Sequence, residues 1–245
     1  MNRKSIGKIL VVTVGIISLG VLSAAAGQRH RSGTFENSRG ASGTFQQNID
    51  RQPGQYSRDT TAQTANGKVW QRNVQDNWNR QAGTANRSVT TTAPNGKTAT
   101  INETASHNGN TTTVNGSRTG YDGKTSSWDK TITGNGNGTA SVTGQYTRQN
   151  GNTIDASSTV TKTANGHDMT GTYTTSTGKG GSFDTTVVNS DGSHTVTQTV
   201  TGANGKSAER VATTTKDGNT IDHTVTTTGP NGKIETHSGS VTFNQ

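Results

Sequence analysis

From about residue 65 to the C-terminus, β-branched and polar residues alternate along the chain with a period of two. In 193–201, threonines occupy every second position, and the positions between them hold His, Val, Gln and Val. The same alternation recurs in 153–163 and in 219–228. A period of two in segments rich in Thr and Val predicts β-strands with two different faces.

Asn-Gly and Asp-Gly pairs separate these segments. Several of the pairs follow each other at steps of 13 to 15 residues, and double steps cluster near 27. One version of the turn reads Ala/Pro-Asn-Gly-Lys, as in 94–97, and the other reads Asn/Asp-Gly-Asn-Thr, as in 108–111. Such pairs are typical of two-residue hairpin turns of type I′. Their rough alternation predicts a repeating hairpin of about 27 residues.

The predicted fold class is therefore all-β. We expect a repetitive antiparallel meander of about 12 strands over residues 65–245, arranged as an extended single-layer sheet or as an open, barrel-like sheet. The segment 69–80 is ambiguous because Trp70, Val74 and Trp78 fit a helical and a strand period equally, but the neighbouring repeats favour a strand. A transmembrane barrel is rejected because these strands lack an outward apolar band.

Residues 1–26 have the layout of a secretory signal peptide. Basic residues come first, an apolar run of about 14 residues follows at 9–22, and the small residues of 23–26 end the segment. The run is shorter than the roughly 20 residues of a membrane-spanning helix. We therefore expect cleavage after Ala25 or Ala26 rather than an uncleaved anchor. The predicted location is the medium or the cell envelope of a bacterium.

Residues 27–64 show no lasting period, although the fragment at 32–35 recurs at 42–45. Residues 27–80 hold 8 Lys and Arg against 4 Asp and Glu. We interpret 27–64 as a disordered, basic, low-complexity linker. As an N-terminal arm it would contact polysaccharide or another anionic polymer, the alternative being a merely solvated linker. Its arginines are Arg29, Arg31, Arg39, Arg51 and Arg58.

Composition limits what such a chain can do. Of its 245 residues, 24% are hydrophobic, 48 are threonine and none is cysteine. Neither a nucleophile elbow nor a phosphate-binding loop nor a zinc-protease motif occurs. The six histidines show no repeated ligand spacing, and the Asp residues in 151–155 and 218–222 lack the tandem repeats of calcium-binding rolls. The sequence predicts no catalytic, cofactor-binding or metal-binding residues and no cofactor, hence no enzyme.

The Thr-x-Thr and Asn-Gly-Lys strings of residues 65–245 resemble the repeat tracts of secreted bacterial proteins described as adhesin-like. The leading hypothesis is a non-catalytic exported repeat protein of the cell surface, envelope or extracellular matrix. Self-association through sheet edges is expected as well. The alternative is a binding module whose Thr-rich faces match polysaccharide or ice, although the uneven turn spacing argues against strict register. A third class, an enzyme, would need a pocket with titratable groups.

Overall fold

A computed structural model describes residues 26–244, and these form sixteen strands without a helix. The predicted signal peptide lies, except for its last residue, outside the described residues. No helix in the described part is long and apolar enough to cross a membrane. The strands are β1 (Gly27–Asn37), β2 (Ser42–Gln52), β3 (Gln55–Thr64), β4 (Val69–Asn79), β5 (Thr84–Thr92), β6 (Thr98–Asn108), β7 (Thr111–Thr119), β8 (Thr125–Gly136), β9 (Thr139–Thr147), β10 (Thr153–Lys162), β11 (Gly166–Thr175), β12 (Gly180–Ser190), β13 (Ser193–Gly202), β14 (Ser207–Asp217), β15 (Thr220–Thr228) and β16 (Ile234–Phe243).

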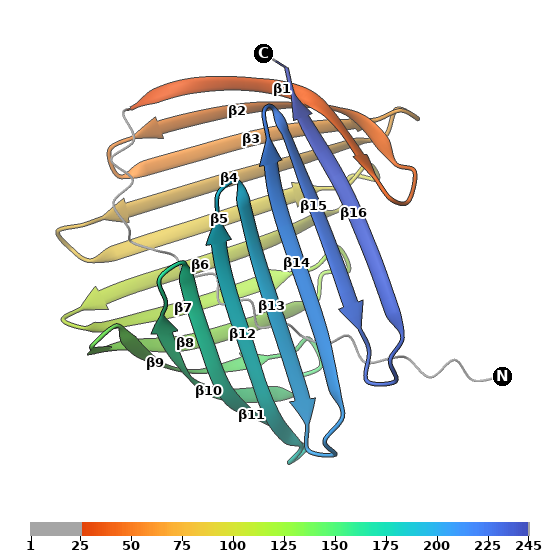
Figure 1. Cartoon of the computed structure of the whole chain (residues 1–245). Helices are drawn as coiled ribbons and strands as arrows, with labels where there is room; N and C mark the ends of the chain where they lie inside the picture. Colours follow the sequence, from red (N-terminus) through yellow and green to blue (C-terminus); the bar gives the residue numbers. More distant parts are fainter. Residues whose placement is uncertain (1–25, 245) are drawn as a thin grey trace.

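Each strand pairs antiparallel with its neighbours in the chain, so the predicted meander is confirmed. β1 also pairs with β16, which closes the sheet into a barrel. Figure 1 shows β1–β5 at the back, running at a steep angle to β12–β16 at the front. The sequence does not decide between an open and a closed sheet. Closure pairs about half of each edge strand that we expected to support self-association. The seam between β1 and β16 is short, with five residue pairs between 33–37 and 239–243.

The prediction that residues 27–64 form a disordered linker is wrong, because these residues form β1, β2 and β3. They supply three of the four strands by which the count of sixteen exceeds the expected number of about 12. The two copies of Ser-Gly-Thr-Phe lie antiparallel to each other, with Gly33 opposite Phe45 and Phe35 opposite Gly43. Each phenyl ring therefore covers the strand position where the other copy has no side chain. The repeated fragment is a self-complementary strand pair rather than low-complexity sequence.

The buried side chains come from one face of each strand and form a thin core inside the barrel. Val74 of β4 and Val114 of β7 are the largest side chains with less than 2% exposure. Trp78 packs against Ala85, Ala105 and Val114. The segment 69–80 is thus a strand, as predicted, and two of its apolar residues contribute to the core. The third, Trp70, remains 38% exposed.

One end of the barrel carries a regular series of three-residue loops. The residue that precedes each loop donates its N–H to the carbonyl of the residue that follows the loop. The N–H of the loop glycine donates to the carbonyl of the residue that precedes the loop. This is a type I turn followed by a glycine in the left-handed region. The loops are 38–40, 65–67, 94–96, 121–123, 149–151, 176–178, 203–205 and 230–232. Their glycines lie 27 to 29 residues apart, which confirms the predicted hairpin unit.

The predicted turn type is wrong at nearly every position. A type I′ turn needs a positive φ at both central residues. Among the described non-glycine residues, Asn137 has a positive φ, of 46°, and with Gly138 it forms the two-residue turn of this type. At Asn66 and Asn204 the asparagine keeps a negative φ, and the following glycine alone is left-handed. The extra loop residue changes the hydrogen bonds of the turn without changing which strands pair.

Replacing a turn glycine by valine is expected to damage its hairpin. Gly205 and Gly218 have φ values of +72° and +53°, and a Cβ at either position would have no atom within 4 Å, so backbone strain alone sets the cost. We expect Gly205→Val or Gly218→Val to lower the free energy of unfolding by about 1–3 kcal/mol. Thr197→Ser, on the outer face of β13, should cost much less. Urea unfolding of the three variants compares them.

Candidate functional site

Hydroxyl and amide side chains are frequent on the outer face of the barrel. Because residues opposite each other in antiparallel strands point to the same side, the register defines a continuous line of hydroxyls from β5 to β14, which we call the hydroxyl row. Its members are Thr84, Ser106, Thr113, Thr131, Thr143, Ser157, Thr172, Ser182, Thr201 and Ser207. At its two ends the side chains hydrogen-bond directly, with 2.6 Å between the hydroxyls of Ser106 and Thr113 and 2.7 Å between those of Thr201 and Ser207.

The hydroxyl row keeps its register although the turn spacing varies. One end of the barrel carries three-residue loops, and the other carries two-residue loops and the four-residue loop 80–83, so the variation in spacing is absorbed in the loops. Adjacent strands lie roughly 4.8 Å apart, and every second residue of a strand lies about 6.7 Å from the next. The expectation that uneven spacing would destroy the order of the Thr faces is therefore wrong. The outer wall carries a regular, curved lattice of hydroxyl groups.

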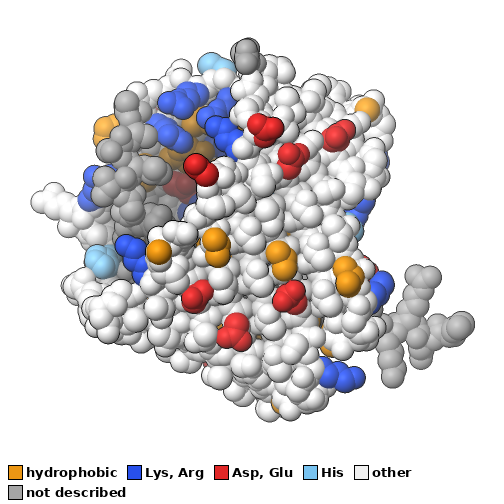
Figure 2. Space-filling view, viewed as in Figure 1, with side chains coloured by type: hydrophobic (Ala, Val, Ile, Leu, Met, Phe, Trp, Pro, Cys, Tyr) orange, Lys and Arg blue, Asp and Glu red, His pale blue; other side chains and the backbone are white. Residues whose placement is uncertain are grey.

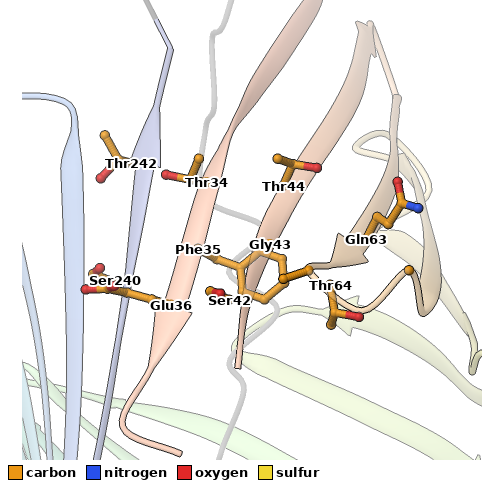
Figure 3. Close-up of a pocket in the computed structure, with 12 residues that line it drawn as sticks. Thr34, Phe35, Glu36, Ser42, Gly43, Thr44, Gln63, Thr64, Ser240 and Thr242 are labelled. Atoms are coloured by element: carbon orange, nitrogen blue, oxygen red, sulfur yellow. The ribbon is translucent and has the colours of Figure 1, made fainter. Parts of the chain in front are cut away.

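A groove of about 720 Å³ lies where β16, β1 and β2 meet the turn between β3 and β4. Figure 3 shows its hydroxyl groups spread over neighbouring strands, with the phenyl ring of Phe35 between them. Glu36 is the carboxylate in its lining, and Gln63 supplies an amide. Phe35 faces inward, whereas Thr34, Thr44 and Thr242 face outward, so the ring and these hydroxyls lie on opposite faces of the sheet. The groove holds no pair of titratable groups suited to acid–base chemistry among its lining residues.

Charged residues are sorted between the two faces of the barrel wall. Every Lys and Arg within a strand lies on the face that carries the buried core residues: Arg29, Arg31, Arg51, Arg58, Arg72, Arg87, Arg118, Lys130, Lys162, Arg210 and Lys216. The strand carboxylates on the outer face are Glu36, Asp50, Asp59, Asp129, Asp155, Asp168, Asp184, Glu209, Asp217 and Asp222. The inward carboxylates are Asp76, Glu103 and Glu235.

The space-filling view agrees with this sorting. Figure 2 shows isolated Asp and Glu side chains and a line of separate hydrophobic side chains on a mostly uncoloured outer wall, while Lys and Arg gather in a hollow at one side. Cations on the inner wall and anions on the outer wall are separated by one sheet. Because a concave surface of one sign concentrates its field, the hollow attracts anions and the outer wall repels them.

Some charged side chains of the inner wall, on β4 and β8, are partly buried. Burial lowers the pKa of Arg72, and the neighbouring charges of Arg58 and Arg87 lower it further. Burial raises the pKa of Asp76, although the cations of Arg87 and Arg58 oppose the shift. On β8, burial lowers the pKa of Lys130 against the effect of Glu103. All three shifts show that charge on this wall is partly removed from water.

The arginines, histidines and aspartates that the sequence offers as candidates lie in different parts of the structure. Arg29, Arg31, Arg51 and Arg58 point inward from strands, and Arg39 lies in a loop, so they form no flexible arm. Five histidines pair with polar neighbours, for example His194 with Asn189 at 2.7 Å. Asp155 accepts a hydrogen bond from Gln145. Within residues 26–244 no group of three or more His, Asp or Glu side chains is placed to hold a metal ion.

The distribution of charge between the two faces can be predicted from pairs of adjacent, oppositely charged residues, and not from hydrophobicity. Neighbouring residues of a strand point to opposite faces. Adjacent residues of opposite charge therefore place a cation on one side of the sheet and an anion on the other. Such neighbours occur at 50–51, 58–59, 129–130, 209–210 and 216–217. In each of them the cation faces inward.

Comparisons with known proteins give no relative from which a role can be inferred. No protein-family model, no curated protein and no solved structure matches the chain.

Proposed function

We propose that this chain is a non-catalytic, exported protein of the bacterial cell surface, envelope or extracellular matrix, which binds a hydroxyl-rich polymer through its outer wall. The observation that carries the proposal is the hydroxyl row, which runs in register from β5 to β14. The signal-like segment at 1–26 supports export. The chain then acts as a structural or adhesive component, with polysaccharide as the partner that its outer hydroxyls and amides suit.

Polysaccharide fits the outer wall better than ice does. A closed sheet is twisted, so the hydroxyl row follows a curve rather than a plane. A polysaccharide chain can bend along such a line, whereas an ice surface is flat. The groove that Glu36 lines, where β16, β1 and β2 meet, adds a recess that can hold one sugar unit. We expect no thermal hysteresis at high protein concentration, and its detection would favour ice instead.

Removing hydroxyls from the row is expected to weaken binding to insoluble polysaccharide. The variant Thr131→Val, Thr143→Val, Thr172→Val keeps the side-chain shape and the β-branch but loses three hydrogen-bonding groups. At about 0.5–1.5 kcal/mol for each net hydrogen bond, the triple variant should bind roughly tenfold or more weakly. Sedimentation with cellulose, chitin and peptidoglycan sacculi measures the bound fraction.

The matched control carries the same change at inward threonines. Thr91, Thr185 and Thr227 lie on the inner face, so valine there leaves the outer wall intact. The control should bind as the unaltered protein does. Equal binding by both triple variants, or no binding of any of the three polymers by the unaltered protein, would contradict the proposal.

A further inference from the structure

We propose that the inner wall formed by β3, β4 and β5 binds an acidic saccharide, with Arg58, Arg72 and Arg87 holding its anionic groups and Trp70 contacting its ring. This site lies on the face of the sheet opposite the hydroxyl row. Its ligand differs in charge from the polymer proposed for the outer wall, and the two sites can be tested separately.

The register brings the three arginines onto one patch. Arg58 lies opposite Val74, whose exposure is 1%, and is therefore inward. On β4 the residues on either side of Val74 on this face are Arg72 and Asp76, and Arg87 of β5 lies opposite Asp76. One carboxylate is thus surrounded by cations from three adjacent strands. The patch keeps a net positive charge.

Two buried polar atoms of this patch form no hydrogen bond with each other or with other groups. Nε of Arg87 lies 3.8 Å from Oδ1 of Asp76, which is too far for a hydrogen bond. Nε of Arg58 and Oδ1 of Asp76 are both buried and have no hydrogen-bond partner. A buried donor without a partner is costly, and a guanidinium presents its donors in a fork that fits carboxylate, phosphate or sulfate. An anion contacting Arg58 would satisfy that donor.

Exposed aromatic rings lie beside the arginines. Trp70 is on the same face of β4 as Arg72, two residues away. Its ring meets Tyr121 in an edge arrangement, with 6.3 Å between the centroids, and both residues are 38% exposed. Aromatic faces suit the C–H faces of a sugar ring, and the arginines suit its acidic substituents. Together they form a surface that recognises a sugar and its charge.

The charge of the outer wall favours a short ligand. A long polyanion that continued past the rim would run along the outer carboxylates, which repel it. The hollow seen in Figure 2 accommodates Lys and Arg side chains together with apolar ones. An acidic oligosaccharide of a few units can stay within the hollow. A long nucleic acid strand would extend beyond the hollow, where the outer carboxylates repel it.

Titration calorimetry with the purified protein tests the proposal. The probes are trigalacturonic acid, a sulfated heparin trisaccharide, neutral maltotriose and a short oligothymidylate. We expect heat of binding with at least one acidic saccharide, none with maltotriose, and an affinity that falls as salt rises. The acidic saccharide that binds shows whether carboxylate or sulfate is preferred. Binding should also change the tryptophan fluorescence, and Trp70→Phe should reduce that change.

Variants locate the site. Arg58→Gln and Arg72→Gln each remove a charged donor, and each should weaken binding by roughly 10- to 100-fold. Arg39→Gln is the matched control, because Arg39 lies exposed in the loop 38–40, where its side chain contacts His237 of β16. It should leave the affinity unchanged. Thermal unfolding of each variant checks that the barrel remains folded, and Arg72→Lys, which keeps the charge, should lose less affinity than Arg72→Gln.

Three results would overturn the inference. One is equal affinity for maltotriose and the acidic saccharides. Another is tighter binding of oligothymidylate than of either acidic saccharide, which would make the ligand a nucleic acid. The third is unchanged affinity in folded Arg58→Gln and Arg72→Gln proteins. The Thr→Val variants of the hydroxyl row should bind the acidic saccharide normally, so failure of the outer-wall proposal leaves this test intact.

Discussion

Joining Thr34 to Thr242 by a disulfide is expected to raise the free energy of unfolding by about 4–5 kcal/mol. Both residues are replaced by cysteine, and because the natural chain contains no cysteine, no other disulfide can form. The link would join β1 to β16 across the seam and close a loop that contains nearly the whole barrel. A long loop gains most in the chain-entropy description of disulfides.

The geometry of the seam allows this bond. The N–H of Ser38 donates to the carbonyl of Ser238, and the N–H of Asn244 donates to the carbonyl of Ser32. Thr34 and Thr242 lie opposite each other in the same register. They are therefore a hydrogen-bonded pair with roughly 5.5 Å between the Cα atoms. A disulfide spans about 4.4–6.8 Å between Cα atoms.

A disulfide within one hairpin is the matched control. Thr226 and Thr236 also lie opposite each other on the outer face, with 3.1 Å between their hydroxyls, but they join neighbouring strands. The corresponding double-cysteine variant closes a short loop and should gain no more than about 3 kcal/mol. Urea unfolding with and without reductant gives both gains. If the seam cysteines stay reduced, or if their link stabilises no more than the control, the sheet does not close as described.

The hairpin order of the barrel was predictable from local sequence, because its determinants are local. Glycine at the turns and alternation along the strands decide which segments pair. The turn type was missed because an Asn-Gly pair suits two loop lengths, and the choice depends on hydrogen bonds such as those between Thr64 and Lys68. Closure was also beyond local reasoning. It depends on the accumulated twist of sixteen strands and on five residue pairs between the ends of the chain.

The strands β1–β3 are hard to predict because their inward faces mix a few apolar residues with arginine, glutamine and glycine. On β1 the inward positions hold Arg29, Arg31, Gly33 and Phe35, so a hydrophobic period is absent over most of the strand. The glycines that weaken the pattern are nevertheless filled by aromatic rings from the partner strand. The positions of aromatic residues and glycines, taken together, identify the pair.

The inward arginine patch is not predictable from the sequence for a related reason. No motif along the chain reveals it, because Arg58, Arg72 and Arg87 come together across three strands. Arg58 and Arg72 contribute to the positive net charge of residues 27–80, but without strands that charge indicates only a flexible arm. The alternation of charge between adjacent residues carries the missing information. It requires the strand assignment first, because opposite faces exist only in a strand.

Placing valine at Gly116 is expected to destabilise the barrel by about 3 kcal/mol. Gly116 of β7 lies opposite Trp128 of β8, and the indole covers the glycine so closely that a Cβ there would overlap the ring. On the other side Trp128 lies opposite Tyr146 of β9, so a large side chain stands where the indole would have to move. Overpacking of this kind typically costs about 1–3 kcal/mol, occasionally more. Urea unfolding of Gly116→Val measures the loss.

Gly134→Val is the matched control, because Gly134 is also an inward glycine and the nearest atom to a Cβ there is 3.7 Å away. Its stability should change by less than about 1 kcal/mol, since valine favours strands. A double-mutant cycle then tests the cause. If overlap with the ring sets the cost, Gly116→Val should cost far less in a Trp128→Ala background, with a coupling of about 1–3 kcal/mol. Additive costs would mean that the indole does not cover Gly116, and the pairing of glycine with aromatic residues would then not explain how the strands of this barrel pack.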